Sequence, residues 1–253
     1  MSKNVAVIFA GGSGVRMGSG IPKQFLEVNG KPIIIHTLEI FEEHPRIDEI
    51  YIACKEDSIG KLKKYIERFW IKKVKAIVPG GTSALGSIYN GLMAAKENND
   101  DDAIMLIHDG VRPCITSDLI TDVINNVKEK GSAVTCTALF ETPVMSKSGD
   151  IVEDIPSRDD FYTAQAPQCF YLGEVLAAHE KVRAENPEYK GLVDTCSVMR
   201  LFGKEVSIVK GPRGNIKVTT PEDLYIFRAM MQYRETQDAF GLTQKETPEK
   251  FVK

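Results

Sequence analysis

The segment AGGSGVRMG, residues 10–18, directly follows an apolar run that starts at residue 5, and Pro-Lys-Gln follows at residues 22–24. An apolar strand that leads into a glycine-rich turn is typical of the first strand of an α/β fold, where phosphate groups bind at the carboxyl end of the strand. Glycines let the backbone turn its N–H groups toward an anion, and Arg16 and Lys23 add two cations on the same exposed loop. The segment therefore predicts transfer at a nucleoside triphosphate, because charge that develops on phosphate oxygens must meet preset donors. The expected nucleotide contacts in this loop are Ala10, Gly11, Gly12, Ser13 and Gly14.

Two commoner glycine motifs do not fit this loop. A dinucleotide-binding fingerprint needs a glycine three residues after Gly14, where this chain has Met17. A Walker A loop needs Gly-Lys followed by Ser or Thr, whereas Lys23 is preceded by proline and followed by glutamine. The remaining alternative is a plain tight turn. It is disfavoured because such a turn requires neither Arg16 nor the Pro-Lys-Gln sequence.

Length, charge and cysteine content narrow the class of protein. With 253 residues, 43% of them hydrophobic, the chain predicts a single nucleotidyltransferase domain at residues 1–236 and a loosely held polar tail at residues 237–253. The net charge is only −3, with Lys and Arg scattered, so no nucleic acid partner is expected. Because the sequence contains no membrane span and no signal-peptide pattern, we expect a cytoplasmic protein without a membrane partner. Five cysteines without a CxxC pair argue against a disulfide framework or a zinc site.

Apolar runs alternate with helical patterns along most of the chain. Strands are expected at residues 5–10, 49–53, 74–79, 103–108, 133–138 and 206–210, and helices at residues 33–43, 58–69, 87–96, 117–130, 174–183 and 221–232. This alternation predicts an α/β fold with a Rossmann-like, mostly parallel sheet and helices on both faces. Residues 140–158 interrupt it and read as two strands around a turn, so we expect a protruding β-hairpin arm at about residues 139–160.

A second candidate site lies in the sequence LIHDGVRP, residues 106–113. Asp109 follows an expected strand and so falls at the same sheet edge as the glycine loop, where a carboxylate holds Mg²⁺ or a substrate hydroxyl. Arg112 suits bidentate pairing with a phosphate. A helix N-cap aspartate with a surface arginine is the structural alternative. His108 is expected to be a structural residue rather than a base.

These motifs, with IPKQFL at residues 21–26, YTAQAPQCF at 162–170 and GNIKVTTPEDL at 214–224, resemble the pyrophosphorylase-type cytidylyltransferases that act on alditol phosphates. The resemblance spans nearly the whole chain. It implies CTP and an alditol phosphate as substrates, Mg²⁺ as cofactor, and a homodimer in which the arm of one subunit reaches into the site of the other. The residues implied to be catalytic are Arg16, Lys23 and Lys217. The residues implied to bind the acceptor are Asp109, Arg112, Thr142 and Arg158, with Gly110 near the nucleotide and Asp109 also a metal ligand.

The acceptor of such an enzyme is a phosphate monoester, which is already an anion near neutral pH because its second pKa is about 6. In-line attack then needs no general base. We expect catalysis by positioning and charge neutralisation, with Mg²⁺ bridging the triphosphate, Arg16 and Lys23 on the developing charge, and Lys217 at the α-phosphate. Without the resemblance, Lys217 reads equally well as part of a solvated face.

A second glycine loop, GGTSALGS at residues 80–87, is expected to recognise the base. The expected contacts in it are Gly81, Thr82 and Ser87. Relatives usually carry Arg at the position of Ala84, a longer polar residue at Gly86 and Thr at Ala166, so the use of uridine remains an alternative.

The loop HDGVRP favours ribitol 5-phosphate as acceptor. Enzymes for methylerythritol phosphate typically have two alanines at the positions of Gly110 and Val111, whereas ribitol-type relatives resemble HDSVRP or HDGVRP. Two alternatives remain: a 2-C-methyl-D-erythritol 4-phosphate cytidylyltransferase of isoprenoid synthesis, and a catalytically impaired nucleotide-binding regulatory protein. The second is disfavoured because a mere binder has no need for so many converging charges.

Overall fold

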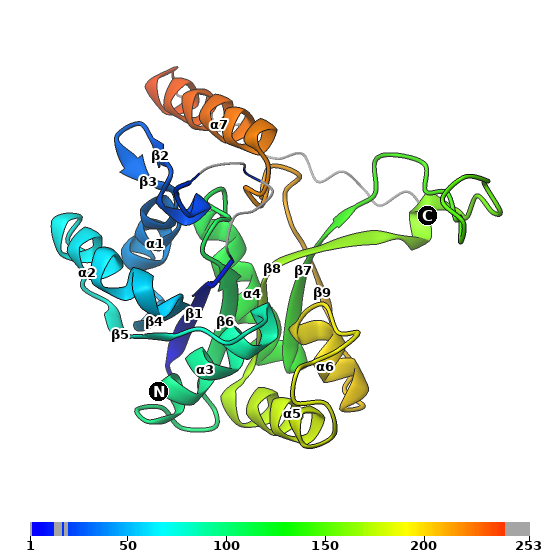
Figure 1. Cartoon of the computed structure of the whole chain (residues 1–253), viewed down its shortest axis with the longest axis horizontal. Helices are drawn as coiled ribbons and strands as arrows, with labels where there is room; N and C mark the ends of the chain where they lie inside the picture. Colours follow the sequence, from blue (N-terminus) through cyan, green and yellow to red (C-terminus); the bar gives the residue numbers. More distant parts are fainter. Residues whose placement is uncertain (1, 13–16, 18–19, 241–253) are drawn as a thin grey trace.

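The computed structural model describes residues 2–12, 17 and 20–240. A seven-stranded sheet in the order β5-β4-β1-β6-β8-β7-β9 forms its centre (Figure 1). The strands are β1 (Asn4–Ala10), β4 (Glu49–Cys54), β5 (Val74–Pro79), β6 (Ile104–Asp109), β7 (Ser132–Ala138), β8 (Tyr162–Tyr171) and β9 (Ile208–Lys210). Only β8 runs antiparallel to its neighbours, which confirms the expected mostly parallel sheet.

The register of the central strands brings the two candidate sites together. In the parallel pairs, Ala10 of β1 lies opposite Cys54 of β4, and Phe9 of β1 lies opposite Asp109 of β6. These three strands are mostly apolar and almost entirely buried, as expected for parallel strands covered on both faces. The glycine loop and Asp109 therefore leave the sheet at the same edge and as neighbours.

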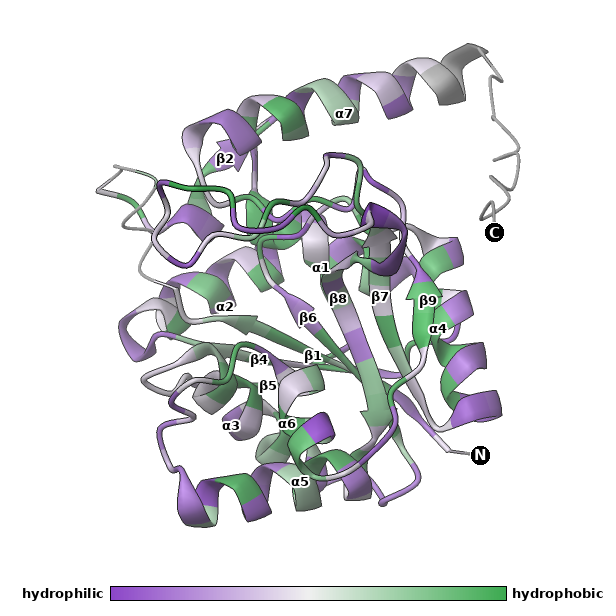
Figure 2. Ribbon diagram, turned by 90° about the vertical axis from the view of Figure 1, so that its right-hand side faces the viewer, coloured by the Kyte–Doolittle hydropathy of each residue, from purple (hydrophilic) through white to green (hydrophobic). Residues whose placement is uncertain are grey.

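Helices cover both faces of the sheet, as predicted. One face packs against α1 (Ile33–Glu43), α2 (Ile59–Arg68) and α4 (Ser117–Lys130) through a core that includes Leu38, Leu62 and Val123. The other face packs against α3 (Ala84–Lys96), α5 (Leu172–Glu185) and α6 (Thr195–Leu201) through Leu92, Val175 and Val198. Figure 2 shows the hydrophobic residues concentrated in the inner strands. None of the helices that the structure describes has the length and apolar character needed to cross a bilayer.

A small hairpin, β2 (Glu27–Val28) and β3 (Lys31–Pro32), lies beside the sheet and was not predicted. Asn29 and Gly30 form its turn with positive φ angles of 51° and 74°, the backbone that an Asn-Gly hairpin turn requires. Helix α7 (Pro221–Phe240) packs on the hairpin through Phe227, which lies in a cluster with Val28. Because α7 continues to Phe240, the first residues of the expected tail are helical; residues 241–253 lie outside the described part of the chain.

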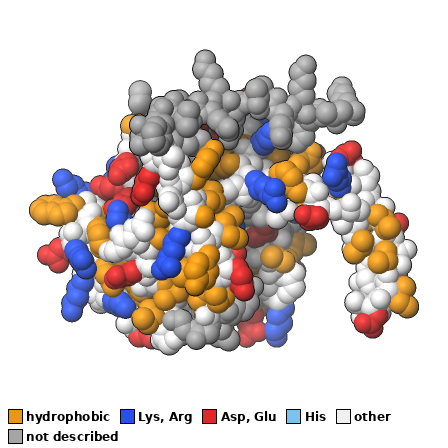
Figure 3. Space-filling view, turned by 90° about the horizontal axis from the view of Figure 1, so that it is seen from above, with side chains coloured by type: hydrophobic (Ala, Val, Ile, Leu, Met, Phe, Trp, Pro, Cys, Tyr) orange, Lys and Arg blue, Asp and Glu red, His pale blue; other side chains and the backbone are white. Residues whose placement is uncertain are grey.

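The expected arm projects from the outer ends of β7 and β8 (Figures 1 and 3). Its described residues are joined by one antiparallel bridge, between Met145 and Asp154, instead of the two strands that we expected. Pro143 and Pro156 lack an N–H group and fall opposite each other on the side of that bridge toward the sheet, so they limit the ladder there. The arm is a projecting loop rather than a regular hairpin.

Candidate active site

A pocket of about 1010 Å³ opens at the carboxyl edge of the sheet. Its size suits a nucleotide, and its place at strand ends is the usual ligand site of open α/β sheets. The two glycine loops contribute Ala10, Gly11, Gly12, Gly80, Gly81, Thr82, Ser83, Ala84 and Ser87. Lys23, Asp109 and Lys217 also line it. The expected residues Ser13, Gly14 and Arg16 lie outside the described part of the chain.

Ser87 joins the two glycine loops. Its Oγ accepts a hydrogen bond from the N–H of Gly81 at 3.1 Å and donates to the carbonyl oxygen of Ser83 at 3.0 Å. A Cβ on Gly11 or on Gly80 would lie only 2.9 Å from this hydroxyl, so a larger residue at either position would displace Ser87. Helix α3 is capped by Ser83, whose Oγ accepts a hydrogen bond from the N–H of Gly86 at 3.0 Å.

Lys23 does not lie on an exposed loop as expected: it is 9% exposed and belongs to the short 3-10 helix η2 (Lys23–Phe25). Phe25 is buried in the core, and Gln24 donates a hydrogen bond to the carbonyl oxygen of Ala10 at 3.1 Å. These contacts pull the segment under the glycine loop, where a Cβ on Gly12 would lie 3.8 Å from Cε of Lys23. The lysine therefore lines the floor of the pocket instead of its solvent side.

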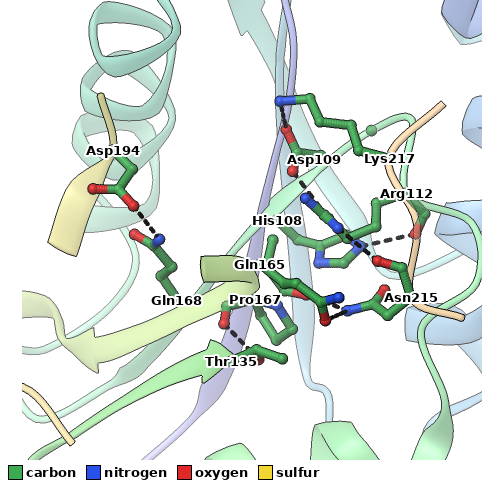
Figure 4. A network of polar contacts seen from close by, with 12 residues as sticks. His108, Asp109, Arg112, Thr135, Gln165, Pro167, Gln168, Asp194, Asn215 and Lys217 are labelled. Atoms are coloured by element: carbon green, nitrogen blue, oxygen red, sulfur yellow. Dashed lines mark hydrogen bonds and ion pairs between the residues drawn. The ribbon is translucent and has the colours of Figure 1, made fainter. Parts of the chain in front are cut away.

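Asp109 links the two cations of the second candidate site (Figure 4). Its Oδ1 lies 2.5 Å from Nζ of Lys217, and its Oδ2 accepts a hydrogen bond from Nε of Arg112 at 3.2 Å. The side chains of Asp109 and Arg112 are 7% and 10% exposed, whereas that of Lys217 is 40% exposed. Burial alone would raise the pKa of Asp109, but Lys217 and Arg112 together hold it below its usual value. The carboxyl group is therefore ionised at neutral pH.

Arg112 is neither a surface residue nor part of the pocket lining. Besides its bond to Asp109, it donates from Nη1 to the carbonyl oxygen of Asn215 at 2.6 Å. Helix α4 has Thr116 as its N-cap, so the alternative of a capping aspartate with a surface arginine is wrong. The bidentate contact of Arg112 with a substrate phosphate stays a prediction.

His108 is fully buried, and its Nε2 lies 3.0 Å from the carbonyl oxygen of Arg112. The carbonyl only accepts, so Nε2 carries the proton, and Nδ1 has no hydrogen-bond partner among the described residues. Burial lowers the pKa of His108 to about 4. The ring is neutral at neutral pH and packs against Phe41, which agrees with the structural role that we expected.

Three further predicted residues do not line this pocket within one chain. Gly110 packs behind the nucleotide loop, where a Cβ would lie 3.0 Å from Cβ of Ala10. Thr142 and Arg158 are exposed on the arm, and Arg158 donates to the carbonyl oxygen of Phe140 at 3.4 Å. Contact of these arm residues with the acceptor stays a prediction.

Sequence reasoning missed the pocket residues that follow β4. Lys55, Glu56 and Asp57 also line the pocket and belong to the segment around the 3-10 helix η3 (Glu56–Ser58). The signal was available, since β4 was expected to be a parallel strand and its carboxyl end falls at the same edge. In the described residues, no group of three or more His, Cys, Asp or Glu side chains could hold a metal, so Asp109 would act with ligands from a substrate.

Comparison with known proteins gives a consistent result. The sequence model of the 2-C-methyl-D-erythritol 4-phosphate cytidylyltransferase family (IspD) matches residues 4–233. A ribitol-5-phosphate cytidylyltransferase of Vibrio parahaemolyticus serotype O3:K6 is 44% identical over 239 residues, 94% of this chain and 100% of that protein. Its counterpart in Streptococcus agalactiae serotype III is 42% identical over 240 residues, with coverages of 94% and 100%. A 2-C-methyl-D-erythritol 4-phosphate cytidylyltransferase of Clostridium botulinum strain Loch Maree is 39% identical over 232 residues, with coverages of 92% and 99%.

Solved structures agree with the fold. The crystal structure of 4-diphosphocytidyl-2C-methyl-D-erythritol synthase from Anaerococcus prevotii superposes with a TM-score of 0.78 at 29% identity, over 91% of this chain and 96% of that one. The crystal structure of the 2-C-methyl-D-erythritol 4-phosphate cytidylyltransferase of Francisella tularensis gives a TM-score of 0.74 at 28% identity, over 93% of this chain and 100% of that one.

Proposed function

Because this chain belongs to the 2-C-methyl-D-erythritol 4-phosphate cytidylyltransferase family and is a CTP-dependent enzyme that uses an alditol phosphate, we propose that its acceptor is ribitol 5-phosphate. The relatives described as ribitol-5-phosphate cytidylyltransferases share 42–44% of residues with it, against 39% for the relative described as the methylerythritol enzyme. Val111, one of the two loop residues that favour ribitol phosphate, lines the pocket. The products would be CDP-ribitol and pyrophosphate.

Competition between the two acceptors at limiting CTP tests this choice, with both CDP products quantified. A pocket that merely lacks a matching contact discriminates weakly, so we expect the ribitol product in roughly 10-fold to 200-fold excess. Predominant formation of the methylerythritol product would overturn the acceptor and leave the cytidylyltransferase activity in place.

The convergence of two glycine loops, Lys23, Asp109 and Lys217 on one pocket supports the mechanism. A phosphate oxygen of the acceptor attacks the α-phosphorus of CTP, a new P–O bond forms, and the bond to pyrophosphate breaks. Lys23 and Lys217 neutralise the negative charge that develops there, with Arg16 assigned the same role. His108 does not act as a base, because it is buried and the acceptor phosphate is already an anion.

Asp109 fits the cofactor Mg²⁺. This ion binds through one or two carboxylates together with substrate phosphates, and Asp109 supplies an ionised oxygen ligand at the pocket wall. When bound, Mg²⁺ would neutralise charge on the triphosphate of CTP. Asp109 would hold it, while Lys217 and Arg112 keep the carboxyl group ionised.

The arm supports a homodimer. Val144, Met145, Ile151, Val152 and Ile155 are each 50–68% exposed, and hydrophobic side chains gather on the projection at the right of Figure 3. A soluble monomer rarely exposes such a patch, so burial against a second copy is favoured. Thr142 and Arg158 would then complete the acceptor site of the partner.

Pyrophosphate release on mixing the protein with CTP, Mg²⁺ and a panel of alditol phosphates tests the activity as a whole. Release is expected only when an alditol phosphate is present. Tight CTP binding without release from any acceptor would instead support the nucleotide-binding regulatory protein.

A further inference from the structure

Lys217 belongs to a segment, residues 211–220, that forms neither helix nor strand. Next to Lys217, the N–H of Val218 donates a hydrogen bond to the carbonyl oxygen of Val111 at 2.8 Å, but no regular backbone ladder holds this segment. A lysine on an irregular segment keeps its place only if side chains replace the missing backbone ladder. Two residues before Lys217, Asn215 provides such a link.

Asn215 is fully buried, with no exposed surface. Its Nδ2 donates to the carbonyl oxygen of Ala166 at 2.7 Å and to Oε1 of Gln165 at 3.2 Å, both on strand β8. Since a backbone carbonyl only accepts, this contact sets the orientation of the amide. The side chain therefore attaches the irregular segment to the sheet.

The backbone of Asn215 closes a ring with the charged residues (Figure 4). Its carbonyl oxygen accepts from Nη1 of Arg112 at 2.6 Å, Arg112 bonds Asp109, and Asp109 contacts Lys217 at 2.5 Å. The chain between Asn215 and Lys217 completes the ring. Displacement of Asn215 would thus shift the arginine and the lysine together.

We propose that Asn215 is a positioning residue for cytidylyl transfer: its buried amide, held by β8, sets the place of the Lys217 ammonium group in the pocket. This inference rests on the role proposed for Lys217. A misplacement of about 1 Å in a reacting constellation costs on the order of 100-fold in rate, so removal of the amide is expected to lower turnover while substrate binding changes little.

A double-mutant cycle tests the proposal through Asn215→Ala, Lys217→Ala and the combined variant. Asn215→Ala is expected to lower kcat by about 10-fold to 100-fold with the KM for CTP within about 3-fold of wild type. If the amide acts through the lysine, the double variant is at most about 3-fold slower than Lys217→Ala alone. Fully additive losses, or a wild-type kcat in Asn215→Ala, would overturn the proposal. A wild-type kcat in Lys217→Ala would instead remove the role of the lysine on which the proposal rests.

Asn99 offers a matched control. It is also buried and donates from Nδ2 to Oε2 of Glu49 at 3.1 Å and to the carbonyl oxygen of Ala95 at 2.9 Å. Like that of Asn215, its Oδ1 has no hydrogen-bond partner among the residues that the structure describes. Its partner Glu49 is the first residue of β4, so Asn99 lies at the amino end of that strand, whereas the pocket lies at the carboxyl end. Asn99→Ala is expected to lower the melting temperature while kcat stays within about 2-fold of wild type. If Asn215→Ala fails to fold, Asn215→Ser, which keeps one donor, is measured in the same cycle with the same criteria.

Discussion

Substitution of Asp109 by asparagine removes a negative charge at the pocket wall that lies between Arg112 and Lys217. Arg112 would then keep its desolvated guanidinium group without a counter-charge, because its side chain is 10% exposed. Lys217 is 40% exposed and can turn toward solvent, so leaving it unpaired costs less stability than leaving Arg112 unpaired. The unpaired arginine therefore accounts for most of the stability lost in Asp109→Asn.

The magnitude follows from this difference in burial. Breaking a buried pair by removing one partner costs about 3–5 kcal/mol, whereas an exposed partner adds at most about 1 kcal/mol. Because 1 kcal/mol shifts the melting temperature of a chain of this size by about 2–4 °C, we expect Asp109→Asn to melt roughly 10 °C below wild type at pH 7. Turnover should fall by on the order of 100-fold or more, since the variant also loses the proposed metal ligand.

The loss of stability should depend on pH in a defined direction. The pKa of Asp109 is lowered in the folded protein, so its contribution is present above the unfolded pKa of about 3.9 and is lost as pH falls through the folded pKa. The difference in stability between wild type and Asp109→Asn should therefore be constant from pH 7 to about pH 5 and shrink below pH 4.

Urea unfolding followed by far-ultraviolet circular dichroism measures this difference. Tryptophan fluorescence suits it poorly, because the single tryptophan, Trp70, is 77% exposed in the folded chain. Glu188→Gln, which breaks an exposed pair with Lys190, is the control and should leave stability unchanged. A melting temperature of Asp109→Asn within about 2 °C of wild type would refute the argument that this carboxylate balances a buried arginine.

Three further expectations concern the pocket floor, the arm and the buried histidines. Lys23→Ala should lower kcat for pyrophosphate release by about 100-fold or more, and near-wild-type activity would remove the proposed mechanism. Arg158→Ala should raise the KM for the acceptor more than that for CTP, and mixing it with the Lys23→Ala protein should restore activity in some heterodimers; no restoration, with subunit exchange verified, would mean that each site is built from one chain. The pKa values of His108 and His179 are each lowered to about 4, so stability should fall as pH drops from about 6.5 toward 4, because only the unfolded chain takes up these protons. Calorimetry in that range should show a shallower fall in His179→Phe than in wild type, and an unchanged slope would contradict the assignment.

The sequence by itself determined the parallel core of the fold and the nucleotide end of the site. Apolar runs alternating with helical patterns, and a glycine loop after the first run, are local signals that need no knowledge of the rest of the chain. They placed β1, β4 and β6 correctly and led to Gly11, Gly12 and Asp109 at one pocket. The carboxyl ends of parallel strands meet at one edge of the sheet, so the residues that follow the predicted strands could be assigned to one site in advance.

Only the tertiary structure decided where β8 lies and what holds Asp109, Arg112 and Lys217 in place. Residues 162–171 did not read as a strand because they contain Gln165, Pro167 and Gln168, yet these glutamines are buried and bonded to distant residues, Gln165 to Asn215 and Gln168 to Asp194. A buried polar side chain is stable only with such partners, and partners 26 to 50 residues away leave no periodic trace in the sequence. The burial of Lys23 and Arg112 has the same origin, since both follow from long-range packing. Local chemistry therefore specified which groups reach the pocket, and non-local hydrogen bonds determined how they are held there.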